Sequence, residues 1–233
     1  MSSTSSPHAP RAIAVPRPGL RTFPGWGPLV VQMVLVGGAA LCYFAVRGLT
    51  QSSLGLAQEN ARDLVALEQR LGLDWEHTTQ ALIIDHDRLV RLVDAVYMYG
   101  HWPVIALTLG WLFVRTPDRF CLLRNAMFVS GAIGLVIFAL VPVAPPRLGV
   151  LDLVDTVTQR TTEYRTLQPP GLINRYAALP SLHFGWNLLV GIVVWQASRS
   201  TLLRLAAVAC PVAMAFAVVA TANHYVVDVV AGG

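Results

Sequence analysis

Long, uninterrupted apolar runs are the feature of this sequence that most constrains its fold. A helix needs about 20 apolar residues to cross a bilayer, and runs of that order begin near Trp26, Cys121 and Leu202. Of the 233 residues, 55% are hydrophobic and only 13% are charged, and a soluble domain would carry about twice that charge. We therefore expect an all-α fold, a polytopic bundle of membrane helices that forms one domain.

Six membrane-spanning helices are predicted, and the last of them is incomplete. The apolar runs cover residues 26–46, 96–114, 121–141, 182–197, 202–222 and 224–233. The last run has about ten residues, which is too few to span a bilayer. We interpret it as a half helix or, preferably, as the start of a span in a chain that is cut short at Gly233.

Two stretches outside these runs have their own patterns. Within residues 48–95, apolar positions recur at spacings of three and four along 56–71, which predicts an amphipathic helix, and a second such piece covers 76–93. We expect both to lie on the outer membrane surface, and a small soluble insertion is the alternative. Residues 1–25 are rich in Ser, Pro and Arg and predict a disordered, basic tail.

The arginines indicate how the helices are oriented. The chain contains no lysine, and the segments 1–25, 115–124 and 198–204 together carry eight arginines and one acid. Short cytoplasmic loops of membrane proteins are enriched in basic residues. We therefore place the N-terminus in the cytoplasm and the protein in the cell membrane, with residues 48–95 and 142–180 on the outer side.

This orientation brings three distant segments to the outer face. They are "PVAPPRLG" after the third run, "PSLHFGW" at the start of the fourth, and "NHYVVDVVAGG" at the start of the sixth. They contain Arg147, His183, His224 and Asp228. The topology thus predicts two imidazoles, a carboxylate and an arginine at one membrane face.

The spacing of these residues suggests specific roles. His224 and Asp228 are four apart, so on a helix they share a face, and Asp228 could fix the tautomer of His224 and leave its other nitrogen as a base or nucleophile. Ser181 is expected to cap the helix that follows Pro180, with His183 in the first turn, where backbone N–H groups favour an anion such as phosphate. A structural hydrogen-bonded pair and a simple capping histidine are the alternatives.

Two arginines are candidates for holding a phosphate. Arg147 follows two prolines that restrict the backbone, and a planar guanidinium suits bidentate contact with phosphate oxygens. Arg175, five residues before Pro180, is the second candidate, and a snorkelling arginine at the interface is the alternative for Arg147. Tyr97, Tyr99 and His101 lie at the outer start of the second run, where we expect them in an aromatic belt, and a polar headgroup site that they line is the alternative.

The segments "PSLH" and "HYVVD" resemble the second and third signatures of the type 2 phosphatidic acid phosphatase (PAP2) superfamily. Together with "APPR" they are similar to its inositolphosphotransferase branch, which contains inositol phosphorylceramide synthases. The resemblance covers about residues 95–233 as a catalytic core and, more loosely, "LEQRLGLDWEHTTQ" before it. It implies a six-helix membrane domain over 26–233 with no metal and no cofactor, in which His224 is the nucleophile, Asp228 its partner and His183 the acid.

Two basic residues of the phosphatase form are absent from this chain. That form has a lysine before an Arg-Pro pair, and its third signature has Ser-Arg several residues before the histidine, where this chain reads "FAVVATANH". The departures favour the transferase branch, or a phosphate site completed by Arg175 or Arg165. We expect Arg147, Arg175 and Ser181 to contact the phosphate.

The expected function is a membrane phosphotransferase or phosphatase that acts through a phosphohistidine. Its substrate would be a lipid phosphate or phospho-headgroup, its acceptor water or a polyol such as inositol, and its surroundings the bilayer, with no nucleic acid partner. The alternatives are a proton-coupled transporter that uses Asp228 and the histidines, a zinc site of His183, His224 and Asp228, and a catalytically inactive membrane scaffold.

Overall fold

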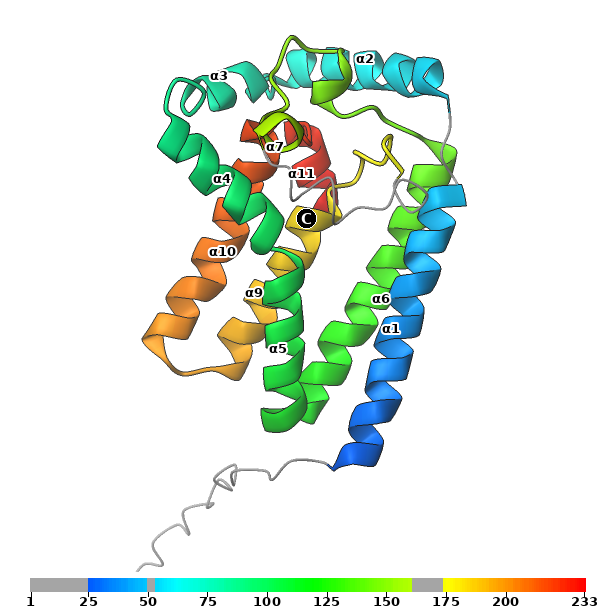
Figure 1. Ribbon diagram of the computed structural model, residues 1–233, viewed down its shortest axis with the longest axis vertical. Coiled ribbons are helices and arrows are strands. Elements are labelled where there is room, and N and C mark those ends of the chain that lie inside the picture. The colour runs from blue at the N-terminus through cyan, green and yellow to red at the C-terminus, as the bar shows by residue number, and fades with distance from the viewer. Residues whose placement is uncertain (1–24, 50–52, 161–173) are drawn as a thin grey trace, which may run out of the picture.

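The computed structural model describes residues 25–49, 53–160 and 174–233 and shows a bundle of helices (Figure 1). Within these ranges no strand forms, and an isolated bridge joins Val143 to Ala177. The predicted tail, 1–25, lies outside the described residues except for Gly25. The elements, in chain order, are α1 (Trp26–Leu49), α2 (Leu54–Leu71), α3 (Glu76–Ala81), α4 (Asp87–Tyr99), α5 (Trp102–Arg115), α6 (Pro117–Leu140), η1 (Pro146–Leu148), α7 (Thr156–Arg160), α9 (Leu182–Ala197), α10 (Thr201–Ala220) and α11 (Val226–Gly232).

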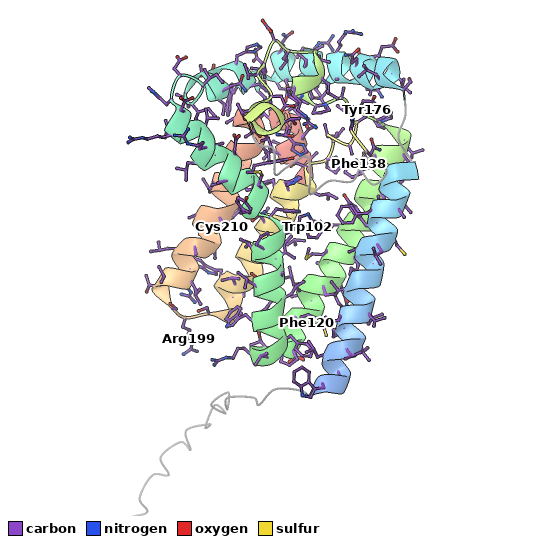
Figure 2. All side chains as sticks on the ribbon, viewed as in Figure 1. Trp102, Phe120, Phe138, Tyr176, Arg199 and Cys210 are labelled. Atoms are coloured by element: carbon purple, nitrogen blue, oxygen red, sulfur yellow. The ribbon has the colours of Figure 1, made fainter. Side chains whose placement is uncertain are left out.

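The long helices run along the longest dimension of the molecule. In Figure 1, α1, α5, α6, α9 and α10 lie below α2 and α3, which cross the upper end, where α7 and α11 also lie. Figure 2 places Phe120 and Arg199 toward the opposite end and Tyr176 at the upper end. The arginine-rich connections before α6 and α10 are therefore separated from the polar segments, which is the separation that the charge pattern predicts.

Several helices have the length and composition of membrane helices. In the part of the chain that the structure describes, α1, α6 and α10 are long and apolar enough to cross a bilayer, and their outward-facing side chains include Val129, Ile133 and Val136 of α6. The apolar helices α5 and α9 have 14 and 16 residues, and α11 has seven. The helices indicate a membrane protein with three helices long enough to span a bilayer and several shorter apolar helices, and the six predicted spans stay a prediction.

The run predicted over 96–114 is not one helix. It is divided where α4 ends at Tyr99 and α5 begins at Trp102, with His101 as the N-cap residue and a proline at the start of α5. Proline lacks an N–H and is tolerated in the first turn of a helix but not in its interior, so Pro103 favours a new helix at this point. The predicted amphipathic piece 76–93 is likewise divided, between α3 and α4.

The amphipathic helix predicted over 56–71 is confirmed as α2, and its buried face packs against the bundle. Ala57, Ala61 and Leu64 contact an apolar cluster that includes Val143 and Tyr225. Polar contacts add to this packing, because two side chains of α2 donate to backbone carbonyls of the segment that follows α6. The helix thus lies across the end of the bundle and covers the loops that carry the candidate site.

Candidate active site

Two histidines from distant segments meet at the end of the bundle that α2 covers. His183 is the second residue of α9, and His224 lies two residues before the start of α11. Their ring centroids are 5.8 Å apart. His224 is buried, whereas His183 is partly exposed. The two imidazoles are therefore close enough to act on one small group held beside them.

Close packing of α9 against α11 brings the histidines together. A Cβ added to Gly185 would collide with the backbone carbonyl of Gly232, and one added to Gly232 would collide with the carbonyl of Ser181. The backbone N–H of Ser181 also donates to the carbonyl of Asp228 at 2.9 Å. Only glycine permits this approach of two backbones, so these glycines set the position of His183 relative to α11.

The environment of His224 fixes its tautomer. Its Nδ1 lies 2.8 Å from the carbonyl oxygen of Ala178 and 3.3 Å from Oδ2 of Asp228. Both neighbours accept hydrogen bonds, so in the neutral ring Nδ1 carries the proton and Nε2 has a free lone pair. The carbonyl of Ala178 is the nearer partner, so a backbone acceptor shares the role that the sequence suggested for Asp228.

The helical geometry predicted for His224 and Asp228 is wrong. His224 precedes α11, whose N-cap residue is Tyr225, so the two residues do not share a helix face. They meet because Asp228, in the first turn, reaches back and accepts the N–H of Tyr225 at 2.9 Å with the same Oδ2 that faces His224. Asp228 therefore caps the helix and contacts the imidazole at once.

His183 lies in a cluster of rings that includes Tyr97 and His101, two residues that we expected in an aromatic belt. Its ring stacks on Tyr97 with centroids 4.8 Å apart and lies 4.4 Å from the ring of His101. His101 in turn stacks on Trp186. Tyr97 and His101 are buried, so the predicted aromatic belt is wrong for both, whereas Tyr99 is exposed. The four-residue spacing of Tyr97 and His101 was the signal that could have placed them side by side.

Arg147 lies beside the residue that precedes His224. In η1, its Nη1 donates to Oδ1 of Asn223, and its Nε is 3.6 Å from Oδ2 of Asp155. Its backbone N–H donates to the carbonyl of Ala222, which has a left-handed backbone (φ 56°) that is uncommon outside glycine. These contacts hold the guanidinium beside Asn223, the residue that precedes His224, and no sequence pattern pointed to Asn223 or Asp155.

The remaining predicted phosphate ligands are placed differently. Ser181 is buried and accepts the N–H of Phe184 at 3.4 Å, so its predicted role as the N-cap of α9 is confirmed. Arg175 is exposed, and within the described ranges no hydrogen bond or ion pair joins it to the histidines. Arg165 lies outside the described residues.

Buried carboxylates that the sequence did not single out also lie at this end. Glu68 of α2 and Glu76 of α3 accept backbone N–H groups from the first turn of α11. Among the described residues, no group of three or more His, Cys, Asp or Glu side chains is arranged to hold a metal ion. The residues His183, His224 and Asp228 therefore do not form the zinc site considered as an alternative.

The chain was compared with known proteins. A family model described as "PAP2 superfamily" matches residues 62–233, which include α2 from Arg62 onward and every residue of the site described above. No curated protein and no solved structure matches the chain closely enough to add to this comparison.

Proposed function

The chain belongs to the PAP2 superfamily, and on this basis we propose that it is an integral membrane enzyme that moves a phosphate or a phospho-headgroup from a lipid to water or to a polyol such as inositol. The observation that carries the proposal is the meeting of His183 and His224, with Nδ1 of His224 held by two acceptors. An imidazole held in this way presents an unprotonated Nε2.

His224 is the proposed nucleophile. Its Nε2 attacks phosphorus, an N–P bond forms, and the bond from phosphorus to the lipid oxygen breaks. His183, in its protonated form, gives its proton to the leaving alkoxide and is left neutral. In the second step His183 takes the proton of water or of an alcohol, whose oxygen attacks the phosphohistidine and releases Nε2. Ala178 and Asp228 hold the Nδ1 proton throughout.

Arg147 and the first turn of α9 are the proposed phosphate ligands. Contacts to Asp155 and Asn223 use two of the guanidinium N–H groups, and the others can reach phosphate oxygens, where one well-placed donor is worth roughly 10²- to 10³-fold in rate. The α9 start supports this role because its first turn contains no acidic residue. Ser181 contributes by capping that turn, and Arg175 has no structural support as a ligand.

An apolar cavity supports a lipid as the phosphate donor. It has a volume of about 350 Å³, lies between α1, α5, α6 and α9, and is bordered by Trp102 and Trp186. Trp186 stacks on His101, and His101 contacts His183. Acyl chains in this cavity would therefore place a lipid phosphate near the histidines. The apolar helices and the arginine-rich connections support a cell-membrane location with the site on the outer side.

The apolar core argues against the proton-coupled transporter. The facing sides of α5, α6 and α9 meet in a cluster of buried apolar residues that includes Leu112, Leu123 and Val190. A proton pathway across the membrane needs ionisable groups along its length. In the described part of this core, the histidines and carboxylates instead gather at the end that α2 covers.

The test is an assay of the purified protein in detergent with ³²P-labelled lipid phosphates, with and without inositol. We expect release of labelled phosphate or its transfer to inositol, and loss of both in His224→Ala and His183→Ala. His77→Ala, which changes an exposed histidine of α3, is the matched control and should retain full activity. Full activity in either site variant would overturn the mechanism.

A further inference from the structure

Three helices supply carboxylates to the first turn of α11. The backbone N–H groups of residues 225–227 each have a carboxylate partner: Asp228 accepts from the first at 2.9 Å, Glu76 from the second at 2.8 Å and Glu68 from the third at 2.7 Å. The side chains of Glu68, Glu76 and Asp228 are termed the carboxylate cluster below. The segment they hold follows His224 directly.

The fold of the segment before α4 brings the two glutamates together. Glu68 lies in the last turn of α2, which ends at Gly72 with a left-handed backbone (φ 67°), and the N–H of Leu73 donates back to the carbonyl of Glu68. Glu76 then begins α3. The stretch "LEQRLGLDWE" forms this reversal of the chain. It precedes the predicted catalytic core and resembles the family only loosely.

The cluster is buried, which makes its contacts energetically important. Glu68 and Asp228 are 0% exposed and Glu76 is 2% exposed. Buried carboxylates are costly unless hydrogen bonds compensate for lost hydration, and the first N–H groups of a helix lack partners within it. Each carboxylate therefore satisfies a backbone donor, and each donor stabilises a carboxylate, so the start of α11 is tied to α2 and α3.

We propose that Glu68 and Glu76 are positioning residues that fix the start of α11 and thereby hold Asp228 and His224 in place for phosphate transfer. This inference rests on the proposed function for its kinetic consequences. The two glutamates touch no substrate. They act through the backbone of residues 225–227, which connects His224 to Asp228.

Protonation of Glu68 lowers the repulsion among three carboxylates that lie so close together. Burial, together with the nearby charges of Glu76 and Asp228, raises the pKa of Glu68 from its ordinary value of 4.5 to about 8, although the hydrogen bond from the N–H of Val227 acts in the opposite direction. The groups facing Glu68 are Glu76 of α3 and, from the α11 start, Asp228 and Tyr225. Oε1 of Glu68 accepts the N–H of Val227, whereas its Oε2 is buried and has no hydrogen-bond partner among the described residues, so Oε2 is the oxygen that can carry the proton, and glutamine has the shape and donor of that protonated acid.

The test compares four variants of the full chain in detergent by kinetics and by hydrogen exchange of peptides covering residues 221–233. Glu68→Met and Glu76→Met remove an acceptor at nearly constant size, Glu68→Gln keeps both the acceptor and the donor, and Glu59→Met changes an exposed glutamate of α2 as the control. We expect kcat to fall roughly 10- to 100-fold in the first two, by analogy with lost supporting contacts of other sites, with KM changed less than about threefold.

Exchange gives a readout that does not depend on activity. In Glu68→Met and Glu76→Met, the amides of 225–227 should exchange faster, whereas Glu68→Gln and Glu59→Met should match the wild type in both exchange and kcat. If a methionine variant does not fold, Glu68→Asp takes its place, since a side chain one methylene shorter withdraws the acceptor but keeps a carboxyl group. Unchanged exchange and kcat in the folded variants would overturn the inference. A wild type without any transfer activity would sink the proposed function, while exchange would still decide the role of the glutamates.

Discussion

The two helix starts that flank the histidines are capped in opposite ways. The α9 start is capped by the neutral hydroxyl of Ser181 and has no acidic residue in its first turn. The α11 start is capped by the carboxylate cluster, with one carboxylate for each of three consecutive N–H groups. The local sequence is sufficient for the first cap, whereas the second needs side chains from helices more than 140 residues away along the chain.

The difference between the two caps suggests different functions for the two helix starts. A helix N-terminus carries partial positive charge and attracts anions, and at α11 the carboxylates already occupy that position. At α9 the cap is neutral, so a phosphate can still benefit from the helix dipole. We therefore assign the phosphate to the start of α9 and the covalent chemistry to the α11 side, at His224, where Arg147 contacts Ala222 and Asn223.

The largest expected effect distinguishes the two histidines by leaving group. His183→Ala should lower kcat with a lipid phosphate by roughly 10²- to 10⁴-fold, the range for loss of a general acid. It should lower phosphorylation by p-nitrophenyl phosphate far less, because nitrophenolate leaves without a proton. His224→Ala should abolish both. Equal losses in the rate of phosphorylation with both substrates in His183→Ala, measured by rapid-quench single-turnover kinetics, would show that His183 is not the general acid.

Arg147 provides the next largest effect. Arg147→Ala should lower kcat/KM by roughly 10²-fold or more, since a donor to the phosphate is lost, and Arg147→Lys should recover only part because it cannot make two parallel contacts. Arg175→Ala, at an exposed position, is the matched control and should stay within about twofold of wild type. A larger loss in Arg175→Ala than in Arg147→Ala would move the phosphate site away from η1.

The pH dependence of stability probes the α11 cap. The pKa of Glu68 is raised on folding from 4.5 to about 8, so the folded protein binds more protons than the unfolded chain between these values. The contribution of Glu68 is then fully present below about pH 4.5 and is lost as pH rises through about 8. We expect the thermal midpoint of wild type to fall between about pH 5 and 8 more steeply than that of Glu68→Gln. Parallel curves would show that Glu68 is not protonated in the fold.

The smallest effect belongs to the α9 cap. Ser181→Ala should cost about 1 kcal/mol of stability, as is usual for loss of an N-cap hydroxyl, and should lower kcat only a fewfold. Thermal unfolding and kinetics on the same preparation measure both. If Ser181→Ala reduced kcat as strongly as Arg147→Ala with unchanged stability, the hydroxyl would be a direct phosphate ligand instead of a cap.

What the sequence alone could predict also differs between these two helix starts. Local signals predicted the helix over Leu182–Ala197 with the bounds that the structure has, and also its cap at Ser181. Local signals failed where the outcome depended on distant partners or on one residue. The prediction of one helix over 96–114 did not take Pro103 into account. The four-residue spacing of His224 and Asp228 suggested a pair on one helix face, but His224 precedes the helix.

Parts of the site have no sequence signature at all. The nearest partner of Nδ1 of His224 is a backbone carbonyl, that of Ala178, and any residue could supply it. Glu68 and Glu76 resemble the ordinary charges of an amphipathic helix until the fold buries them against α11. Asn223 and Asp155 are ordinary loop residues until the fold places Arg147 between them.

The central claim is that His224 becomes phosphorylated, and trapping that intermediate tests it most directly. We would incubate the His183→Ala protein with ³²P-labelled p-nitrophenyl phosphate, quench in alkali, in which phosphohistidine survives, and cleave after arginine. His224 is the one histidine after Arg204. The account predicts that the label accumulates on that peptide, because breakdown without His183 is slow, and that His224→Ala carries none. Turnover with no label at His224, or label retained in His224→Ala, would contradict it.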